Sequence, residues 1–455
     1  MSANKEQMQK EPLEADIRLL DSLLGVEARK PGKAASLSAA IRIVEDLEPA
    51  GGKDVPVFPA SYAGAGDQLP PVYDLAGVEY GDVEETVRVK NSTAKVRQII
   101  RARLCAIDSP QSQANRMEPA FVESADLREL VPQANAVIPR RADIDGATSV
   151  LALPHRIADF RVRLSDRANE VRAVVTAFAG GNALPLIKMF PTSLLFGFWD
   201  SRDQGTKHAR ILLSRIDATD VVPCRRHALY SGPYSKDEFA ETVLGREATK
   251  PEADRLSEQG FSAAPSDGLG GVLVMGKIER LSLLSLTDIA RVNCSAPQPT
   301  SDQNADDNLD AHTPSAPTAD DLTNAARRYL FALAALAEGH ERSKGSHRLR
   351  SGCELIATGT LRFDFRGTQP SKEDGPLLKD LYFHRMRLVE IAKHAMTILG
   401  VKATMAPFNV SRETLSEGFG TPAVTTTAKT STTKKAAGKK ATIKTDDAPE
   451  ANTAS

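Results

Sequence analysis

The stretch IDSPQSQANRME, residues 107–118, carries the clearest local structure in the chain. Ser109 is a favoured residue just before a helix, because its hydroxyl accepts a hydrogen bond from an amide of the first turn. Pro110 suits the first helical position, where its missing amide hydrogen is not needed. Pro119 cannot continue a helix, because it lacks the donor and its ring clashes with the preceding turn. These residues predict a capped helix from Pro110 to about Glu118.

The first two turns of this predicted helix are crowded with hydrogen-bonding side chains. Residues four apart are neighbours on a helix, so Gln111 and Asn115 share one face, as do Ser112 and Arg116. Together with the amides exposed at the helix start, they form an end that can hold phosphate or ribose oxygens. A polar helix start is also commonly a solvated cap, and residue types alone leave this alternative open.

The chain around this helix alternates between helical and extended patterns. Apolar spacing predicts helices over 13–24, 155–178, 322–337 and 377–399. It predicts strands over 39–47, 211–222 and 355–365, and one or two strands over 271–286. Residues 55–71 are rich in Pro, Gly and aromatic residues and are expected to form a long loop. The mixed order predicts an α+β fold.

Three units are expected along the chain. Residues 1–38 form a helical arm, 39–417 a folded body, and 418–455 a disordered tail of Lys, Thr and Ala. Within the body, 295–320 contains almost no large apolar residue, so burial cannot offset its ordering entropy. We expect a disordered insertion there.

The composition indicates a globular protein with locally clustered charge. Of 455 residues, 41% are hydrophobic and 26% charged, and the formal net charge is only −1. There is no run of about 18 apolar residues and no secretory signal, so no membrane contact is expected and the cytoplasm is the expected location. The four cysteines form no Cys-x-x-Cys pair, which argues against a disulfide framework or a zinc knuckle.

The segment 196–210, FGFWDSRDQGTKHAR, combines aromatic residues with cations. A base can stack on an aromatic face while Arg202, Lys207 and Arg210 neutralise phosphates, the usual combination in single-strand binding. The apolar residues just before this segment favour a core position for Trp199. For the three basic residues, solvent and a polyanion remain equal alternatives.

Two further segments concentrate positive charge. The predicted basic loop 138–145 contains Arg140 and Arg141. A second basic loop, 340–350, contains Arg342, Lys344, Arg348 and Arg350. Solvent is the common explanation for one such loop, but several on a near-neutral protein favour a polyanionic ligand.

Motifs for catalysis or for a resident metal do not match well. Asp143 and Asp145 resemble the start of an EF-hand, yet Ala147 and Leu151 follow where further oxygen ligands are needed. No Gly-x-Ser-x-Gly and no His-Glu-x-x-His occurs, and no glycine-rich segment ends in Gly-Lys-Ser/Thr. No cofactor or metal site is therefore expected.

Three motifs resemble a known family. DSPQSQANRME at 108–118, LPHRIADFRVR at 153–163, and FGFWDSR with KHARILLSRI within 196–216 look like the RAMP-superfamily backbone subunit of type I-G (formerly I-U) CRISPR surveillance complexes, the Cascade-type particles. The likeness extends over about 39–417. It implies a ferredoxin-like, RNA-recognition-motif-like core with helical and hairpin insertions.

The resemblance also implies partners and contact residues. Copies of such subunits form a row along CRISPR guide RNA, next to other Cascade subunits, while the guide pairs with the target DNA strand. Residues carried over as RNA contacts are Gln111, Gln113, Asn115, Arg116, His155, Arg156, Arg202, Lys207 and Arg210.

The resemblance implies a non-catalytic subunit, with cleavage left to a recruited nuclease-helicase. One alternative is a metal-dependent endoribonuclease subunit of a related RAMP complex, which would use Asp108, Asp143 or Asp145. The other is a stand-alone single-strand nucleic-acid binder, which needs no assembly.

Overall fold

One large antiparallel sheet organises the chain. The computed structural model describes residues 2–25, 38–63, 71–89, 92–139, 145–230, 238, 240–258, 264–295 and 316–418. The main sheet has the order β13-β14-β1-β12-β10-β5-β4, and β11 pairs with β10 beside this path. Its strands are β1 (Ser38–Pro49), β4 (Leu75–Val89), β5 (Ser92–Asp108), β10 (Leu212–Tyr230), β11 (Ala264–Val274), β12 (Ile278–Ser285), β13 (Ser346–Arg350) and β14 (Cys353–Gly367).

The centre of this sheet is compatible with the ferredoxin-like core that the motifs imply. Its strands lie in the order β14-β1-β12-β10, and each neighbouring pair is antiparallel. Helix α2 (Pro110–Met117) comes between β1 and β10 in the chain, and α12 (Ala319–Ser343) comes between β12 and β14. Strand, helix, two strands, helix and strand is the order of the βαββαβ unit. The prediction of an α+β fold is confirmed.

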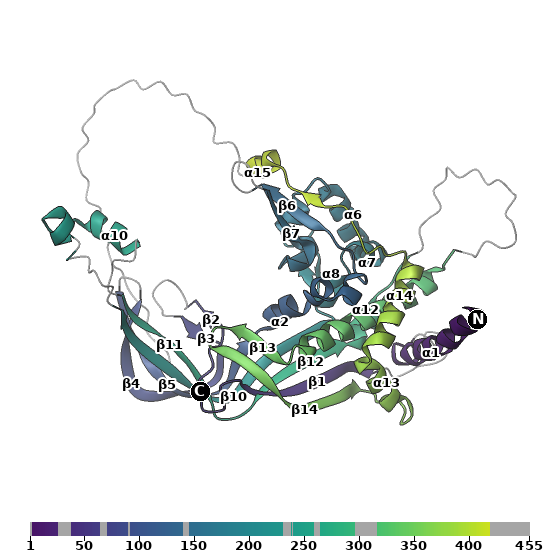
Figure 1. Ribbon diagram of the computed structural model, residues 1–455, viewed down its shortest axis with the longest axis horizontal. Helices are drawn as coiled ribbons and strands as arrows, with labels where there is room; N and C mark the ends of the chain where they lie inside the picture. Colours follow the sequence, from purple (N-terminus) through teal and green to yellow (C-terminus); the bar gives the residue numbers. More distant parts are fainter. Residues whose placement is uncertain are drawn as a thin grey trace, which may run out of the picture.

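Alternation along β12 shows which face of the sheet is covered. Ile278, Arg280, Ser282 and Leu284 are buried, whereas the residues between them are half-buried. Side chains alternate between the two faces of a strand, so the buried set points to one side. Figure 1 shows α2 and α12 on one side of the central strands, which is the side of the main core.

The remaining helices fall into three groups: some pack around α12, others belong to a separate lobe, and η4 and α10 lie near the outer ends of β10 and β11 (Figure 1). They are α1 (Ser2–Leu23), α3 (Ala120–Glu123), α4 (Ala125–Arg128), η2 (Val150–Ala152), η3 (Arg156–Ala158), α5 (Phe160–Arg163), α6 (Ala168–Ala179), α7 (Leu184–Met189), α8 (Pro191–Phe196), η4 (Ala240–Leu244), α10 (Lys250–Glu258), α11 (Leu286–Arg291), α13 (Asp374–Phe383), α14 (Arg385–Leu399) and α15 (Arg412–Gly418). No helix within the described ranges is long and apolar enough to cross a membrane.

The amino-terminal helix α1 is docked on the body. Arg328 of α12 donates to the Asp21 carboxylate at 2.6 and 2.7 Å. Arg387 of α14 donates to Asp16, with one contact at 2.8 Å. Leu20 and Leu24 are buried in the main core. Residues 2–23 thus form a helix that packs against the body, and the division of the chain into an arm, a body and a tail remains a prediction.

Two parts of the chain extend from the central sheet: the first continues it to the left in Figure 1, and the second stands above it. We call β4, β5, β11 and the second half of β10 the wing, because Figure 1 shows these strands reaching away from the helices. We call 135–199 with 400–418 the lobe. It contains a small sheet of β6 (Asn135–Pro139), β7 (Asp145–Ser149) and β15 (Phe408–Asn409) together with α5 to α8 and α15. Two further strand pairs are β2 (Ser61–Tyr62) with β3 (Val72–Tyr73), and β8 (Phe198–Trp199) with β9 (Lys207–His208).

Three sequence predictions are wrong in detail. The single helix over 155–178 is instead η3, α5 and α6, because Asp159 caps a new helix at Arg161 and the chain breaks again at 164–167. The helix over 377–399 is divided at His384 into α13 and α14. The basic loop 340–350 is the end of α12 followed by strand β13.

Other predictions fall partly or wholly outside the described residues. These are Arg140 and Arg141, Asp143, most of the insertion at 295–320, and nearly all of the tail at 418–455. At the end of that insertion, Thr318 caps α12 and forms a reciprocal capping box with Asp321. The four cysteines are all free thiols, and Cys105, Cys294 and Cys353 are buried.

Candidate nucleic-acid interface

Helix α2 begins as the sequence predicts, but one of its polar residues points inward. The Ser109 hydroxyl accepts a hydrogen bond from the amide of Ser112 at 3.3 Å. Gln113 is fully buried, and its Nε2 donates to the Asp108 carboxylate at 2.8 Å. Its Oε1 accepts from the hydroxyl of Ser214 on β10 at 3.2 Å. Gln113 therefore ties α2 to the sheet and is not part of the surface.

Asp108 is the buried centre of a cluster of positive side chains. Its carboxylate accepts from Arg116 Nε at 3.1 Å and from an Nη of Arg350 at 3.0 Å. Both arginines keep about a quarter of their side-chain surface exposed, at 27% each, whereas the Asp108 side chain has none. One carboxylate facing two guanidinium groups leaves a net positive charge at the surface. Asp108 itself is held by these donors and is turned away from solvent.

Arg156 joins the three sequence motifs. Its Nε lies 2.9 Å from Glu118, its Nη atoms donate to the Gly197 carbonyl at 3.3 Å and to Asn115 Oδ1 at 3.5 Å, and its guanidinium lies 5.2 Å from the Phe196 ring centre. Asn115 and Glu118 belong to the first motif, and Phe196 and Gly197 to the third. The motifs are distant in sequence but meet around this one buried side chain.

We call Arg156 and the residues that it contacts the Arg156 junction, and both its backbone conformation and its buried charge are unusual. Arg156 has a φ of 53°, in the left-handed region that residues with a side chain rarely adopt. Burial raises the pKa of Glu118 even though the neighbouring Arg156 opposes the shift. Strained backbone and buried charge of this kind persist only where the surrounding contacts enforce them. The junction is therefore fixed by its neighbours.

The third motif forms a short hairpin, and the prediction for Trp199 is wrong. In the β8–β9 ladder, Phe198 lies opposite His208 and Trp199 opposite Lys207. Phe198 is 6% exposed and packs on Phe178, but Trp199 is 67% exposed. The apolar residues before this motif favoured a core position for Trp199. Alternation along the strand instead places Phe198 inside and Trp199 outside.

The structure divides the sequence-predicted contact residues into three groups. The side chains that reach the surface are Gln111, Asn115, His155, Arg202 and Lys207. Arg116 and Arg210 are half-buried, and burial followed by repulsion from Arg156 lowers the pKa of Arg210. Gln113 and Arg156 are buried, and each contacts the residues around it: Arg156 donates to Asn115, and Gln113 donates to Asp108, which also binds Arg116. The prediction that this set contacts RNA remains a prediction.

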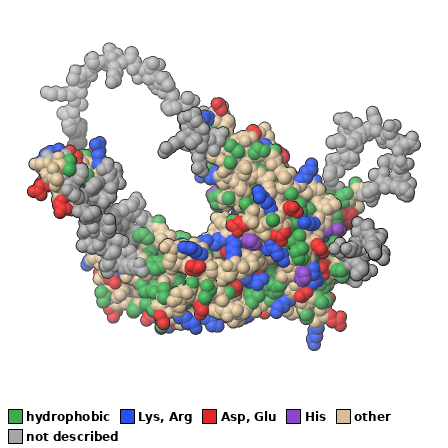
Figure 2. Space-filling view, viewed as in Figure 1, with side chains coloured by type: hydrophobic (Ala, Val, Ile, Leu, Met, Phe, Trp, Pro, Cys, Tyr) green, Lys and Arg blue, Asp and Glu red, His purple; other side chains and the backbone are tan. Residues whose placement is uncertain are grey.

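The basic segment 340–350 contributes less free charge than its sequence suggests. Arg342 lies 4.9 Å from the Phe383 ring centre and 3.8 Å from Glu338. Lys344 lies 3.4 Å from Glu123. Arg348, by contrast, is exposed on β13. Figure 2 shows lysine and arginine side chains along the hollowed side between the wing and the lobe, interspersed with acidic ones.

Two features of the site gave no sequence signal. Arg350 looked like one cation of a basic loop, but it reaches from β13 to Asp108 and to the carbonyls of Phe58 and Ile107, both at 3.1 Å. Arg280 belongs to none of the three motifs, yet it is 1% exposed and donates to Gln113 at 3.3 Å. Each of these partners is remote in sequence, so no local pattern indicates the contact.

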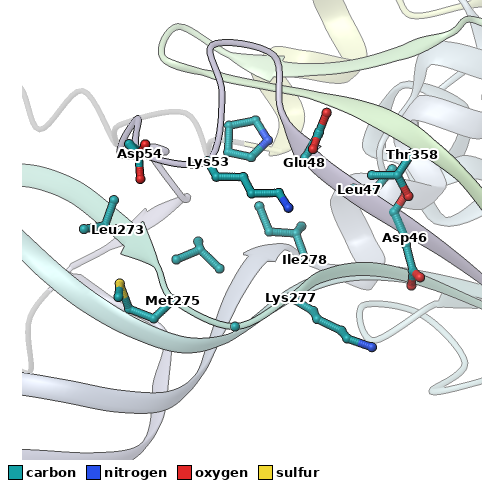
Figure 3. A pocket seen from close by; sticks show the side chains of 13 residues that line it. Asp46, Leu47, Glu48, Lys53, Asp54, Leu273, Met275, Lys277, Ile278 and Thr358 are labelled. Carbon is teal, nitrogen blue, oxygen red and sulfur yellow. The ribbon is translucent and has the colours of Figure 1, made fainter.

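A separate hollow of about 630 Å³ lies where β1 and β11 end and β12 begins, next to Thr358 of β14. It is lined by the charged residues Asp46, Glu48, Lys53, Asp54 and Lys277. Figure 3 shows Lys53 reaching across the hollow and Lys277 pointing away from it. Acidic side chains outnumber basic ones here, which disfavours a phosphate ligand. The hollow is therefore a poor candidate for the nucleic-acid site.

The endoribonuclease alternative requires acidic side chains that can hold a metal ion. Within the described ranges, no three His, Cys, Asp or Glu side chains are grouped to hold an ion. Asp108 is occupied by Arg116, Arg350 and Gln113. Asp143 lies outside the described residues, and the side chain of Asp145 is not described.

Comparison with known proteins identifies a relationship over part of the chain. Residues 41–223 match the family model described as CRISPR-associated protein GSU0053. The GSU0053 match begins in β1 and ends in β10, so it includes all three motifs that meet at Arg156. The match covers less than half of the 455 residues and is a similarity to a CRISPR-associated family. A search of curated proteins found no match.

Proposed function

We propose that this chain is a non-catalytic, RNA-binding backbone subunit of a Cascade-type CRISPR effector complex, of the type I-G RAMP kind that its motifs resemble. Copies line up along the guide RNA beside other complex subunits, the guide pairs with the target DNA strand, and a recruited nuclease-helicase cuts the DNA. The observation that best supports this proposal is that three sequence motifs meet at Arg156, which contacts Asn115 and Gly197. All three motifs lie within the GSU0053 match. Asn115, His155 and the β8–β9 hairpin are therefore close together on one surface.

The chemistry of this surface supports binding more than cleavage. Exposed amide and imidazole groups suit ribose and phosphate contacts, and Arg202 and Lys207 supply charge. Asp108, one candidate base or metal ligand for the endoribonuclease alternative, is buried beneath two arginines. A general base must reach the proton that it removes.

The direct test is to purify the full chain from cells that carry a CRISPR array and the partner subunits. The proposal expects co-purification with RNA of one discrete length, and several copies of the chain per RNA. Binding of random RNA as a monomer, with one affinity for every sequence, would favour the stand-alone binder.

The endoribonuclease alternative is tested by incubating the loaded complex with matched target RNA and Mg²⁺. Regularly spaced RNA fragments that disappear in Asp108→Asn, Asp143→Asn or Asp145→Asn would replace the proposal with an endoribonuclease.

A further inference from the structure

Trp199 is an exposed aromatic residue on a rigid part of the surface. Its side chain is 67% exposed, although Phe198 beside it is almost completely buried. Among the described residues, its ring pairs with no other ring and no cation. An indole that is covered by a partner removes a large apolar area from water, which is favourable. The exposed indole of Trp199 lacks this stabilisation. The position is therefore suited to a ligand that covers the ring.

Lys207 lies directly opposite Trp199 in the β8–β9 ladder and is also exposed. Side chains of directly opposite residues on antiparallel strands stand on the same face, about 5 Å apart at Cβ. Neither Lys207 nor Arg202, in the connecting turn, forms an ion pair within the described part of the chain. An aromatic face with unpaired cations beside it matches a nucleotide, whose base stacks while its phosphate is neutralised.

The hairpin is held in place by contacts of its turn. The Asp200 carboxylate accepts from the amide of Gln204 at 3.3 Å and lies 3.6 Å from Arg163. Asp203 accepts from Arg172 of α6 at 2.9 Å, and Gln204 Nε2 donates to Thr176 of the same helix at 2.8 Å. A surface fixed before binding loses less conformational entropy when its ligand arrives.

The inner face of the hairpin is apolar and uncharged. Phe198 lies 5.7 Å from Phe178, and His208 meets Phe178 edge-on at 5.4 Å, between ring centres. Burial lowers the pKa of His208, so its imidazole is neutral near neutral pH. The positive charge of the hairpin therefore stands on its outer face, next to Trp199.

We propose that Trp199 and Lys207 form a stacking platform for one nucleotide of single-stranded RNA, with the base on the indole and the phosphate at the ammonium group. This inference rests on the proposed function, because it adds a specific contact to the RNA-binding surface. A neighbouring hollow of about 340 Å³ is lined by Lys207 and by Arg291, whose guanidinium is paired with Asp288 at 3.3 Å. The unpaired charge beside the indole therefore comes from Lys207 and Arg202. An apolar protein partner would gain nothing from these cations, so the charge favours RNA.

The chain offers a direct probe, because Trp199 is its only tryptophan. Intrinsic fluorescence of the full chain is titrated with a uridine oligonucleotide and with an abasic ribose-phosphate chain of equal length. Stacking quenches the indole, so the proposal expects quenching by the uridine strand and little by the abasic one. Binding measured by fluorescence anisotropy of a labelled strand should weaken about 5- to 150-fold in Trp199→Ala and stay near wild type in Trp199→Phe.

Two further variants separate the contributions. Lys207→Gln should reduce the salt dependence of binding while quenching at saturation persists. Met386 is a similarly exposed apolar residue on α14, and Met386→Ala should change neither the salt dependence nor the quenching.

RNA binding of normal affinity in Trp199→Ala, without quenching in wild type, would overturn the platform alone. Failure of the wild-type chain to bind any RNA, alone or in the assembled complex, would overturn both the platform and the proposed function. Loss of self-association in Trp199→Ala, with RNA affinity unchanged, would assign the indole to a protein contact instead.

Discussion

Arg156 and Glu118 form an ion pair of 2.9 Å inside the protein, where their side chains are only 4% and 1% exposed. The pair connects the end of α2 to the turn before α5, and Arg156 continues from there to the carbonyl of Gly197. Removing a charge from such a pair leaves its partner buried without compensation, which costs far more than the pair contributes.

Arg156→Met should therefore lower the free energy of unfolding by about 3–5 kcal/mol. The double variant Arg156→Met with Glu118→Leu should recover part of that loss, because no uncompensated charge remains. Urea unfolding followed by circular dichroism measures both. Arg172→Ala, whose side chain is half exposed, serves as the control and should cost less than about 1 kcal/mol. If Arg156→Met were as stable as the double variant or more so, the proposed cost of an unpaired Glu118 charge would be contradicted.

Gly197 allows the hairpin to approach the junction closely. Its φ and ψ of 77° and 158° lie in a region that is essentially restricted to glycine. A Cβ there would lie 3.0 Å from the His208 carbonyl oxygen and 3.2 Å from Cγ of Arg210. Gly197→Ala should cost about 3 kcal/mol in thermal or urea unfolding. Gly205→Ala is a matched control, because Gly205 also has a positive φ but open space around it, and should cost about 1 kcal/mol. Equal losses would show that close approach at Gly197 is unimportant.

His347 should make stability depend on pH. It lies 3.2 Å from Glu45 and 3.6 Å from Glu341, with Arg280 nearby. Burial opposes the protonated imidazole, but hydrogen bonds to Glu341 and Glu45 outweigh burial and raise the pKa of His347. The pKa of Glu341 is about 2, so its carboxylate stays charged throughout the relevant range.

A raised histidine pKa means that the folded state binds the proton more tightly than the unfolded state. The stabilisation is complete below the unfolded pKa of about 6.5 and is lost as pH rises through the folded pKa. His347→Gln should therefore reduce the free energy of unfolding most at roughly pH 5.5 and progressively less toward pH 9. Urea unfolding at several pH values tests this, with the exposed His155→Gln as control. A deficit that grows with pH would contradict the protonated state.

RNA binding should lose one phosphate contact in Arg202→Ala. Each phosphate contact on a single strand contributes about 0.7 to the slope of log binding constant against log salt, through released counterions. We expect the slope to fall by about that amount in Arg202→Ala and to stay unchanged in Lys393→Ala, whose exposed side chain lies on α14 beside Glu129. Anisotropy titrations at four salt concentrations measure both slopes. Equal slopes for wild type and Arg202→Ala would remove Arg202 from the interface.

Local sequence patterns predicted those helices and strands whose start or side-chain alternation depends only on neighbouring residues. Ser109 and Pro110 define the start of α2 from within one turn, and the alternation around Ile41 and Ile43 marks β1. The helix expected over 155–178 failed because its apolar spacing continues across the breaks, and the spacing does not reveal that Asp159 starts a new helix. The sequence therefore predicted the central strands β1, β10, β12 and β14 and the helices α2 and α12, but it missed the wing strands β4 and β5 and several boundaries.

The candidate site was less predictable because its contacts are long-range. Nothing near Gln113 indicates that Ser214 and Arg280 take up its carbonyl oxygen. Trp199 follows several apolar residues, so a core position was the natural inference. Its exposure depends on a two-residue pairing with Lys207, across a turn whose anchors lie on α6. Side-chain direction at such positions is decided by tertiary packing.

Strand β10 has a mechanical consequence for the wing. Its 19 residues extend about 60 Å and pair with β12 in the core, then with β5 and β11 farther out. Core and wing thus share one continuous backbone, whose ladder to β11 is irregular between Pro223 and Arg225. A load applied to the outer end of the wing is transmitted along this strand directly to the residues beneath α2. The wing is therefore joined to the core by a hydrogen-bonded strand and not by a separate linker.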